Sequence, residues 1–292
     1  MTLRFASGIR GLSESYAGVI LDLWGVVHDG FKPYPGAVHA LTQLKAAGKL
    51  TLLLSNAPRR KAVLAEKLEK MGIPPTLYGA VHSSGEEAWQ ALRTRTDPWH
   101  AKLGRACLHL GPARDRNMLE GLDLREVKTP ETADFILNTG TDRDAETLAD
   151  YENLLARGAK AGVPMVCANP DREVLRGKKR ILCAGALAAR YEALGGDVRY
   201  HGKPDPAVFA HAMRMLDLAD RRAVLVIGDS LATDIQGATR AGLDSVLVTG
   251  GLHADELGLA GLRETLPDPG RVAALLEREG FHPIAVIPSL VW

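Results

Sequence analysis

The sequence has almost no excess of charge of either sign. It contains 36 Lys and Arg residues against 35 Asp and Glu residues, which gives a formal net charge of +1 at pH 7. A chain without a basic surplus offers no electrostatic reason to bind nucleic acid or an anionic membrane. We therefore expect neither partner, and a bound anion must be held locally by a few side chains.

Long apolar runs and paired cysteines are also absent. No stretch has the ~20 apolar residues of a membrane span, and residues 1–18 lack the uninterrupted apolar segment of a signal peptide. Cys107, Cys167 and Cys183 lie beside apolar neighbours without the spacing of metal ligands. This pattern indicates buried free thiols in a reducing compartment, and we expect a cytoplasmic protein.

Short apolar runs are present, and each is followed by small, polar or acidic residues. They cover residues 19–21, 50–54, 223–227 and 245–248. Apolar residues at helical spacing fill 36–47, and a second helical segment follows Pro58 and stops at Gly72. Strands that alternate with helices are typical of an α/β protein with a doubly wound parallel sheet. The carboxyl ends of these strands are expected to share one edge.

A second alternation of strands and helices begins near Ser84. Its predicted strands lie within 105–111, 134–140 and 163–169. Because the chain afterwards returns to the first sheet, we interpret this unit as an insertion. With 292 residues, the chain is long enough for two domains. We expect a core made of residues 1–83 and 198–292, with an inserted α/β unit at 84–197.

Polar side chains suited to phosphoryl transfer follow or flank the predicted core strands. These are Asp22, Ser55, Lys203, Asp229 and Asp234. The carboxyl edge of a parallel sheet opens into the crevice where such sheets bind ligands. Asp22 is the predicted nucleophile, which forms an aspartyl phosphate, and Lys203 neutralises the charge that it shares with the phosphate. Ser55 and its neighbour Asn56 are the predicted binders of the phosphoryl oxygens.

Attack of a carboxylate on a dianionic ester requires positive charge at the site. A hard cation such as Mg²⁺, held by oxygen ligands, supplies this charge. Asp22 and Asp229 are the predicted direct ligands, and Asp234 is placed to reach the ion or its waters from the following helix. We expect Mg²⁺ as the cofactor and a small phosphorylated molecule as the substrate.

These motifs, in this order, resemble those of the haloacid dehalogenase-like hydrolase superfamily. The chain reads DLWGV at 22–26, LLLSN at 52–56, GKPDP at 202–206 and GDSLATD at 228–234. The segments SNAPR, CANPD and AGAL are similar to those of its class IIA branch, which contains NagD, p-nitrophenyl phosphatases and pyridoxal phosphate phosphatase. The resemblance implies a Rossmann-like core, an inserted α/β cap, Mg²⁺ and hydrolysis of phosphate esters.

The same resemblance implies roles for residues around the metal and in the cap. The backbone carbonyl of Trp24 matches a further metal ligand. Asn169 and Asp171 match a cap segment that lies near the site. Asp171 is either a contact for a polar or cationic substrate group or a helix N-cap. The sequence leaves open whether two copies pair through the cap as a homodimer.

Trp24 departs from the pattern, because related phosphatases have an Asp here that protonates the leaving oxygen and later activates water. Indole exchanges no proton near neutral pH, so the expected loss is about 100- to 10,000-fold in rate. One interpretation is a phosphatase in which His28 or Asp29 replaces the acid. A second is a phosphate-ligand binding or regulatory protein with little or no turnover.

A third interpretation is a 2-haloacid dehalogenase, because halide leaves without a proton. The intact acids of GDSLATD argue against it, since spare carboxylates repel an anionic haloacid. The phosphatase is therefore the preferred interpretation.

Overall fold

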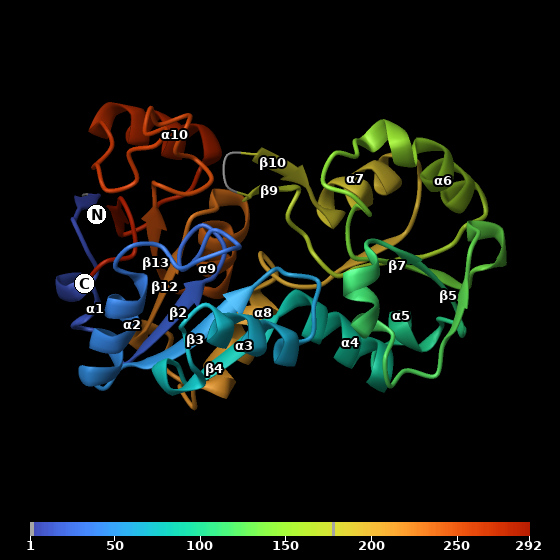
Figure 1. Cartoon of the computed structure of the whole chain (residues 1–292), viewed down its shortest axis with the longest axis horizontal. Helices are drawn as coiled ribbons and strands as arrows, with labels where there is room; N and C mark the ends of the chain where they lie inside the picture. Colours follow the sequence, from blue (N-terminus) through green and yellow to red (C-terminus); the bar gives the residue numbers. More distant parts are fainter. Residues whose placement is uncertain (1–2, 177–178) are drawn as a thin grey trace.

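A sheet of seven parallel strands forms the centre of the core (Figure 1). The computed structural model describes residues 3–176 and 179–292. The strand order is β1-β14-β13-β12-β2-β3-β4, and every neighbouring pair is parallel. In that order the strands span Arg4–Phe5, Ala285–Ile287, Asp244–Val248, Val224–Gly228, Gly18–Asp22, Leu50–Ser55 and Ala80–Ser83.

The central strands of this sheet are buried on both faces. In β2, Val19 and Leu21 belong to one apolar cluster and Ile20 belongs to another, because successive side chains of a strand point to opposite faces. Helices cover both faces, so the predicted doubly wound α/β fold is confirmed. These helices are α1 (Arg10–Ser13), α2 (Ala37–Ala46), α3 (Lys61–Lys70), α8 (Pro206–Met215), α9 (Gln236–Ala241) and α10 (Pro269–Glu279).

A second parallel sheet, of five strands, forms the cap. Its order is β11-β8-β7-β5-β6, with α4 packed in one apolar cluster of the cap and α6 and α7 in another. The strands span Val198–Tyr200, Met165–Cys167, Phe135–Asn138, Ala106–Leu110 and Arg125–Val127. The cap helices are α4 (Ser84–Thr94), α5 (Pro98–Ala101), α6 (Leu148–Lys160) and α7 (Ala184–Ala193).

The cap sheet extends past the boundary at residue 197 that the sequence suggests. Strand β11 pairs with β8, Val198 lying opposite Met165, so the cap sheet ends at Tyr200. This strand has three residues, too few to show an alternation that separates it from the following core motif. The remaining short segments are η1 (Pro75–Leu77), η2 (Ala113–Met118), η3 (Pro130–Thr132), η4 (Arg221–Ala223) and the π-helical turn η5 (Leu231–Ile235).

An antiparallel hairpin, β9 (Glu173–Arg176) and β10 (Lys179–Leu182), extends from the cap toward the core (Figure 1). The chain passes between core and cap twice, before α4 and after β11. These crossings are tied together, because the Ser84 hydroxyl donates a hydrogen bond to the His201 carbonyl oxygen. His201 Nε2 also lies 3.1 Å from His100 Nε2 of α5.

The cysteines and the helices of the described residues relate to two properties expected from the composition, the state of the thiols and the absence of a membrane span. All three cysteines are free and buried, as predicted. Within residues 3–176 and 179–292, no helix combines the length and apolar character needed to cross a membrane.

Candidate active site

The ends of three adjacent strands bring the predicted nucleophile to the carboxyl edge of the core sheet. Strand β2 lies between β3 and β12, with Asp22 opposite Leu54 and Leu21 opposite Ile227. Asp22 and Ser55 end their strands, and Asp229 directly follows β12. Parallel strands in this register place the three side chains at one edge, where α/β sheets bind ligands.

Lys203 connects two of the predicted carboxylates. Its ammonium donates to Asp22 Oδ1 at 2.5 Å and to Asp234 Oδ1 at 2.6 Å. A third bond, of 3.3 Å, goes to the Leu54 carbonyl oxygen. Only 3% of the Lys203 side chain is exposed. Burial lowers its pKa, but attraction to the carboxylates outweighs burial and raises the pKa above its usual value, so Lys203 is a permanent cation.

Asp22, Asp229 and Asp234 form a cluster of buried carboxylates. Each offers an oxygen that lies within 4.8 Å of the oxygens of the other two. Burial and the charge of Asp234 raise the pKa of Asp229 to about 7. Burial likewise raises the pKa of Asp22 well above its usual range, although Lys203 lowers it.

The cluster fits a hard divalent cation. The cluster has three carboxylates and one ammonium, which pairs with two of them, so two negative charges are left over when all three are ionised. Burial, together with this excess negative charge, raises the pKa values of Asp22 and Asp229. All three groups offer oxygen atoms, which are the ligands that Mg²⁺ prefers.

The backbone packs so closely against the Asp229 carboxylate that only glycine fits at positions 25 and 251. A Cβ added at Gly25 would lie 1.9 Å from Asp229 Oδ2, and one at Gly251 would lie 2.1 Å from the same atom. The Leu252 amide donates to Asp229 Oδ2 at 2.8 Å. The carboxylate is therefore fixed in orientation by the backbone around it.

The Asn56 side chain joins three segments at the site. Its Oδ1 accepts from the Lys203 amide at 2.9 Å, and its Nδ2 donates to the Lys203 carbonyl at 3.0 Å. Nδ2 also donates to Asp171 Oδ1 at 2.8 Å. Both polar atoms of this side chain are used to position Lys203 and Asp171. Binding of phosphate at Asn56 through the backbone amides of this turn stays a prediction. Ser55 Oγ, by contrast, accepts only a local bond from the Ala57 amide, at 3.1 Å, among the described residues.

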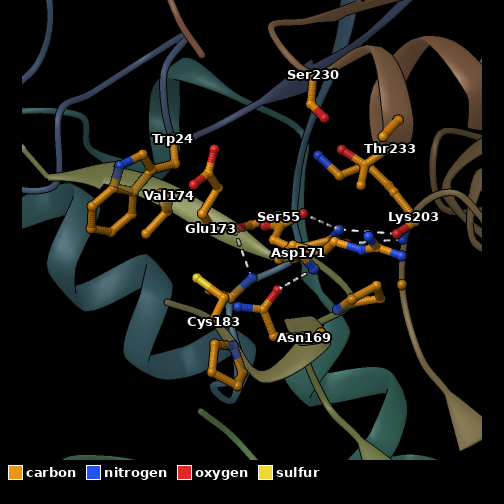
Figure 2. A pocket seen from close by; sticks show the side chains of 18 of the residues that line it. Trp24, Ser55, Asn169, Asp171, Glu173, Val174, Cys183, Lys203, Ser230 and Thr233 are labelled. Carbon is orange, nitrogen blue, oxygen red and sulfur yellow. Dashed lines mark hydrogen bonds between the residues drawn. The ribbon is translucent and has the colours of Figure 1, made fainter. Parts of the chain in front are cut away.

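Asp171 enters the site from the cap and lines the cavity with Asp22, Ser55 and Lys203. Its amide donates to Asn169 Oδ1 at 2.9 Å, so Asn169 shapes the turn that presents it. Burial raises the pKa of Asp171 to about 6, against the lowering effects of Lys203 and Asn56. Asp171 does not cap a helix, because α7 begins at Ala184. Figure 2 shows Asp171 among Ser55, Asn169 and Lys203.

Trp24 directs its side chain to the cap hairpin. The indole N–H donates to the Leu175 carbonyl oxygen at 2.5 Å, and Figure 2 shows the ring beside Val174 of β9. The Lys67 ammonium lies 5.3 Å from the ring centre. A Cβ at Gly30, where φ is +94°, would lie 2.5 Å from the ring. The surroundings of position 24 are therefore shaped to hold an indole.

The structure does not bring His28 or Asp29 into the main cavity. Asp29 Oδ1 accepts from the Phe31 and Lys32 amides at 2.8 and 2.9 Å, which makes it a turn residue. His28 Nδ1 accepts from the Gly30 amide at 3.0 Å. Burial lowers the pKa of His28 to about 4, so the ring is neutral at physiological pH. Neither side chain is placed to replace the acid missing at position 24.

A cavity of about 920 Å³ lies between core and cap. Asp22, Ser55, Lys203 and the acids of the cluster line its core side, and the β9–β10 hairpin contributes apolar side chains on its cap side. The cavity is much larger than a phosphate group. It therefore has room for an organic substituent between the sheet edge and the hairpin.

Arg263 is a cavity residue that no motif or periodicity of the sequence indicates. Its Nη2 donates to the Gly25 carbonyl at 2.6 Å, and its guanidinium carbon lies 3.5 Å from the centre of the Tyr34 ring. It lies in a loop without strand or helix periodicity and outside every motif. The contact connects this loop to the segment that follows the nucleophile.

Comparison with known proteins identifies the family. The haloacid dehalogenase-like hydrolase family matches residues 19–125, and a related family, described as HAD-hydrolase-like, matches residues 200–277. A solved hydrolase of the haloacid dehalogenase-like family from Brucella suis is 32% identical, covers 100% of both chains and has a TM-score of 0.82. The chain belongs to the haloacid dehalogenase-like hydrolase family. The membership predicted from the motifs is therefore confirmed.

Phosphatases are prominent among the relatives. A D-glycerol 3-phosphate phosphatase from Mycobacterium tuberculosis is 30% identical over 84% of this chain, which spans 66% of that enzyme's length. A solved glycerol phosphate phosphatase from the same organism, in complex with magnesium, is 28% identical with a TM-score of 0.63, covering 89% of this chain and 74% of that one. NagD from Escherichia coli shares the fold, with a TM-score of 0.63 at 23% identity over 94% and 97% of the two chains.

Proposed function

We propose that this hydrolase is a Mg²⁺-dependent phosphatase of small phosphate monoesters that works through an aspartyl phosphate on Asp22. The observation that carries the proposal is the Lys203 ammonium held between Asp22 and Asp234, 2.5 and 2.6 Å from their oxygens, at the edge of a cavity. The phosphatases among its relatives support the same reaction class.

In the proposed reaction, Asp22 attacks phosphorus while Lys203 offsets the negative charge that builds up between carboxylate and phosphoryl group. The Ser55 hydroxyl, at the end of the adjacent strand, donates to a phosphoryl oxygen. Asn56 acts indirectly, because its bonds to the Lys203 backbone fix the start of the lysine side chain.

Mg²⁺ would be held by Asp22, Asp229 and Asp234, with the Trp24 carbonyl as a further ligand by family resemblance. It supplies charge neutralisation for a dianionic ester and polarises a phosphoryl oxygen. The excess negative charge of the three-carboxylate cluster supports this requirement.

The test is a panel of phosphate esters assayed with Mg²⁺ and with a chelator, with Asp22→Asn as the blank. The expected result is release of inorganic phosphate that needs both the metal and Asp22. Turnover that persists in Asp22→Asn would overturn the proposed nucleophile. Turnover that persists in the chelator would overturn the metal requirement.

A phosphate-binding protein of low turnover is the second candidate. It is favoured by the bond from Trp24 to Leu175, because this bond holds at position 24 an indole that exchanges no proton near neutral pH. Trapping of Asp22 by fluoroberyllate without ester hydrolysis would identify it.

Dehalogenation has less support, because the buried carboxylates repel an anionic haloacid. Chloride release without metal would support dehalogenation. Cytoplasmic location and pairing through the cap remain predictions.

A further inference from the structure

We infer that Asp171, a carboxylate of the cap, is the general acid and base of this enzyme, in place of a side chain at position 24. The inference rests on the proposed phosphatase function and deepens it. It assigns the proton transfer to the inserted unit instead of the core loop that follows the nucleophile.

Asp171 is held rigidly by three bonds from three directions. Its amide donates to Asn169 Oδ1 at 2.9 Å, and its carbonyl accepts from the Gly185 amide at 3.0 Å. Its side-chain Oδ1 accepts from Asn56 Nδ2 at 2.8 Å. A Cβ at Gly185 would lie 2.6 Å from the Asp171 carbonyl oxygen, so α7 approaches closely only because glycine is present there. Such fixation is what a proton-transfer group requires.

The same bond network places Asp171 beside the reacting groups. Asn56 directly follows Ser55 and also binds both backbone polar groups of Lys203, whose ammonium contacts Asp22. Asp171 lines the cavity together with these residues, on the cap side, where the organic part of an ester must extend (Figure 2). A leaving oxygen that departs away from Asp22 therefore moves toward the cap carboxylate.

The charges around Asp171 suit a group that both gives and takes a proton. Burial raises its pKa to about 6 and Asp234 adds to this, while Lys203 and the Asn56 amide act in the opposite direction. The Cys167 thiol of β8, which donates to the Asn169 carbonyl, stays neutral, because burial raises the pKa of Cys167 to about 12 and the charge of Asp171 adds to this. A general acid works best when its pKa lies near the working pH.

Other acidic side chains of the cavity are already used in the described structure. Asp115 pairs with Arg59 at 2.7 Å, Glu192 accepts from the Tyr200 hydroxyl at 2.7 Å, and Glu173 pairs with Arg180. The remaining engaged acids are the three of the metal cluster and Asp205, which caps α8. Asp144 also lines the cavity but is exposed and has an interaction partner. Among the acids that line the cavity in the described residues, only Asp171, which is partly buried, combines a fixed position with a direct bond to Asn56 of the Ser55–Asn56 turn.

The reaction proceeds in two steps, and Asp171 takes part in both. In the first, an Asp22 oxygen forms a bond to phosphorus, the bond from phosphorus to the ester oxygen breaks, and that oxygen takes the proton of the Asp171 carboxyl group. In the second, the Asp171 carboxylate removes a proton from water as the water oxygen bonds to phosphorus. The bond from phosphorus to Asp22 then breaks, which releases inorganic phosphate and restores the Asp22 carboxylate and the protonated Asp171 carboxyl group.

The decisive experiment compares two leaving groups in Asp171→Asn with Mg²⁺ present. Asn keeps the acceptor for Asn56 but transfers no proton. Hydrolysis of an alkyl ester such as glycerol phosphate is expected to fall about 100- to 10,000-fold in kcat/KM. Release of nitrophenolate in the first turnover of p-nitrophenyl phosphate is expected to stay within about threefold of wild type, because this leaving group departs as an anion. A slow steady state follows, since the second step lacks its base.

The matched control is Glu173→Gln, a carboxylate-to-amide change two residues along the same cap segment. It is expected to leave the ratio between the two substrates unchanged. Equal slowing of both substrates in Asp171→Asn, with a lowered melting temperature, would mean that Asp171 only anchors the cap and would overturn the inference. So would an unchanged rate for the alkyl ester. Wild-type protein without turnover that depends on Asp22 would instead overturn the proposed function, and the inference with it.

Discussion

Removal of the Lys203 ammonium provides a test of the site that needs no substrate. The side chains of Lys203, Asp22 and Asp234 are 3%, 8% and 2% exposed, and the two ion pairs are 2.5 and 2.6 Å long. In Lys203→Met these carboxylates lose their cation without gaining water. Breaking a buried pair from one side costs about 3–5 kcal/mol of folding free energy. We expect a loss of this size in metal-free protein at pH 8.

The loss should depend on pH in a defined direction. The pKa of Lys203 is raised in the folded protein, so its contribution is complete at pH 8 and disappears only in strong alkali. In the variant, the pKa of Asp22 rises further, because the group that lowers it is gone. The folded variant then binds a proton before the unfolded chain does, and its deficit shrinks as the pH falls toward 5.

Urea unfolding followed by circular dichroism, with a chelator present, measures both effects. Lys70→Met is the control, because the Lys70–Glu66 pair is 73% and 64% exposed and such pairs contribute about 0–1 kcal/mol. A deficit below about 1 kcal/mol for Lys203→Met at pH 8 would refute the reasoning. A deficit that stays constant on acidification would refute the assigned cause.

Metal binding, the Trp24 contact and the Gly30 turn provide the other predictions. Mg²⁺ should raise the melting temperature of the wild-type protein and leave that of Asp229→Asn nearly unchanged; equal increases would contradict the metal site. Trp24→Phe removes one hydrogen bond to the Leu175 carbonyl, worth about 0.5–1.5 kcal/mol, so amide exchange in the hairpin should quicken by about 2- to 12-fold, and exchange at the wild-type rate would contradict the contact. Gly30→Ala should destabilise the protein by about 1–3 kcal/mol in urea unfolding, because its Cβ meets the Trp24 ring at a positive φ. Gly11→Ala, with open space around its Cβ, should be near neutral, and similar losses in both variants would contradict the steric cause.

The core and its motifs could be read from the sequence because strand ends fix side-chain position. An apolar run buried on both faces and followed by one acid leaves little choice of geometry, as Asp22 and Asp229 illustrate. The position of Asp171 near the site was also predictable from its cap segment. Its bond to Asn56 was not, because that contact joins residues 115 positions apart.

Two features of the site could not be predicted from the sequence: the partner of Trp24 in the cap and the conformation of the loop that holds His28 and Asp29. The partner of Trp24 is a backbone carbonyl of a hairpin, and a carbonyl has no sequence signal. His28 and Asp29 were plausible acids by proximity to the nucleophile in the chain. Instead, both side chains accept hydrogen bonds from backbone amides of their own loop, at 3.0 Å for His28 and 2.8 Å for Asp29.

The paired crossings between core and cap have an evolutionary consequence. Because the Ser84 hydroxyl bonds to the His201 carbonyl, the cap leaves and rejoins the core at one place. A unit whose two ends meet can be exchanged as a block without stretching the sheet beneath it. With the proposed proton donor on the cap, such an exchange would transfer substrate selection and acid–base chemistry together, and would leave the core the task of holding phosphate.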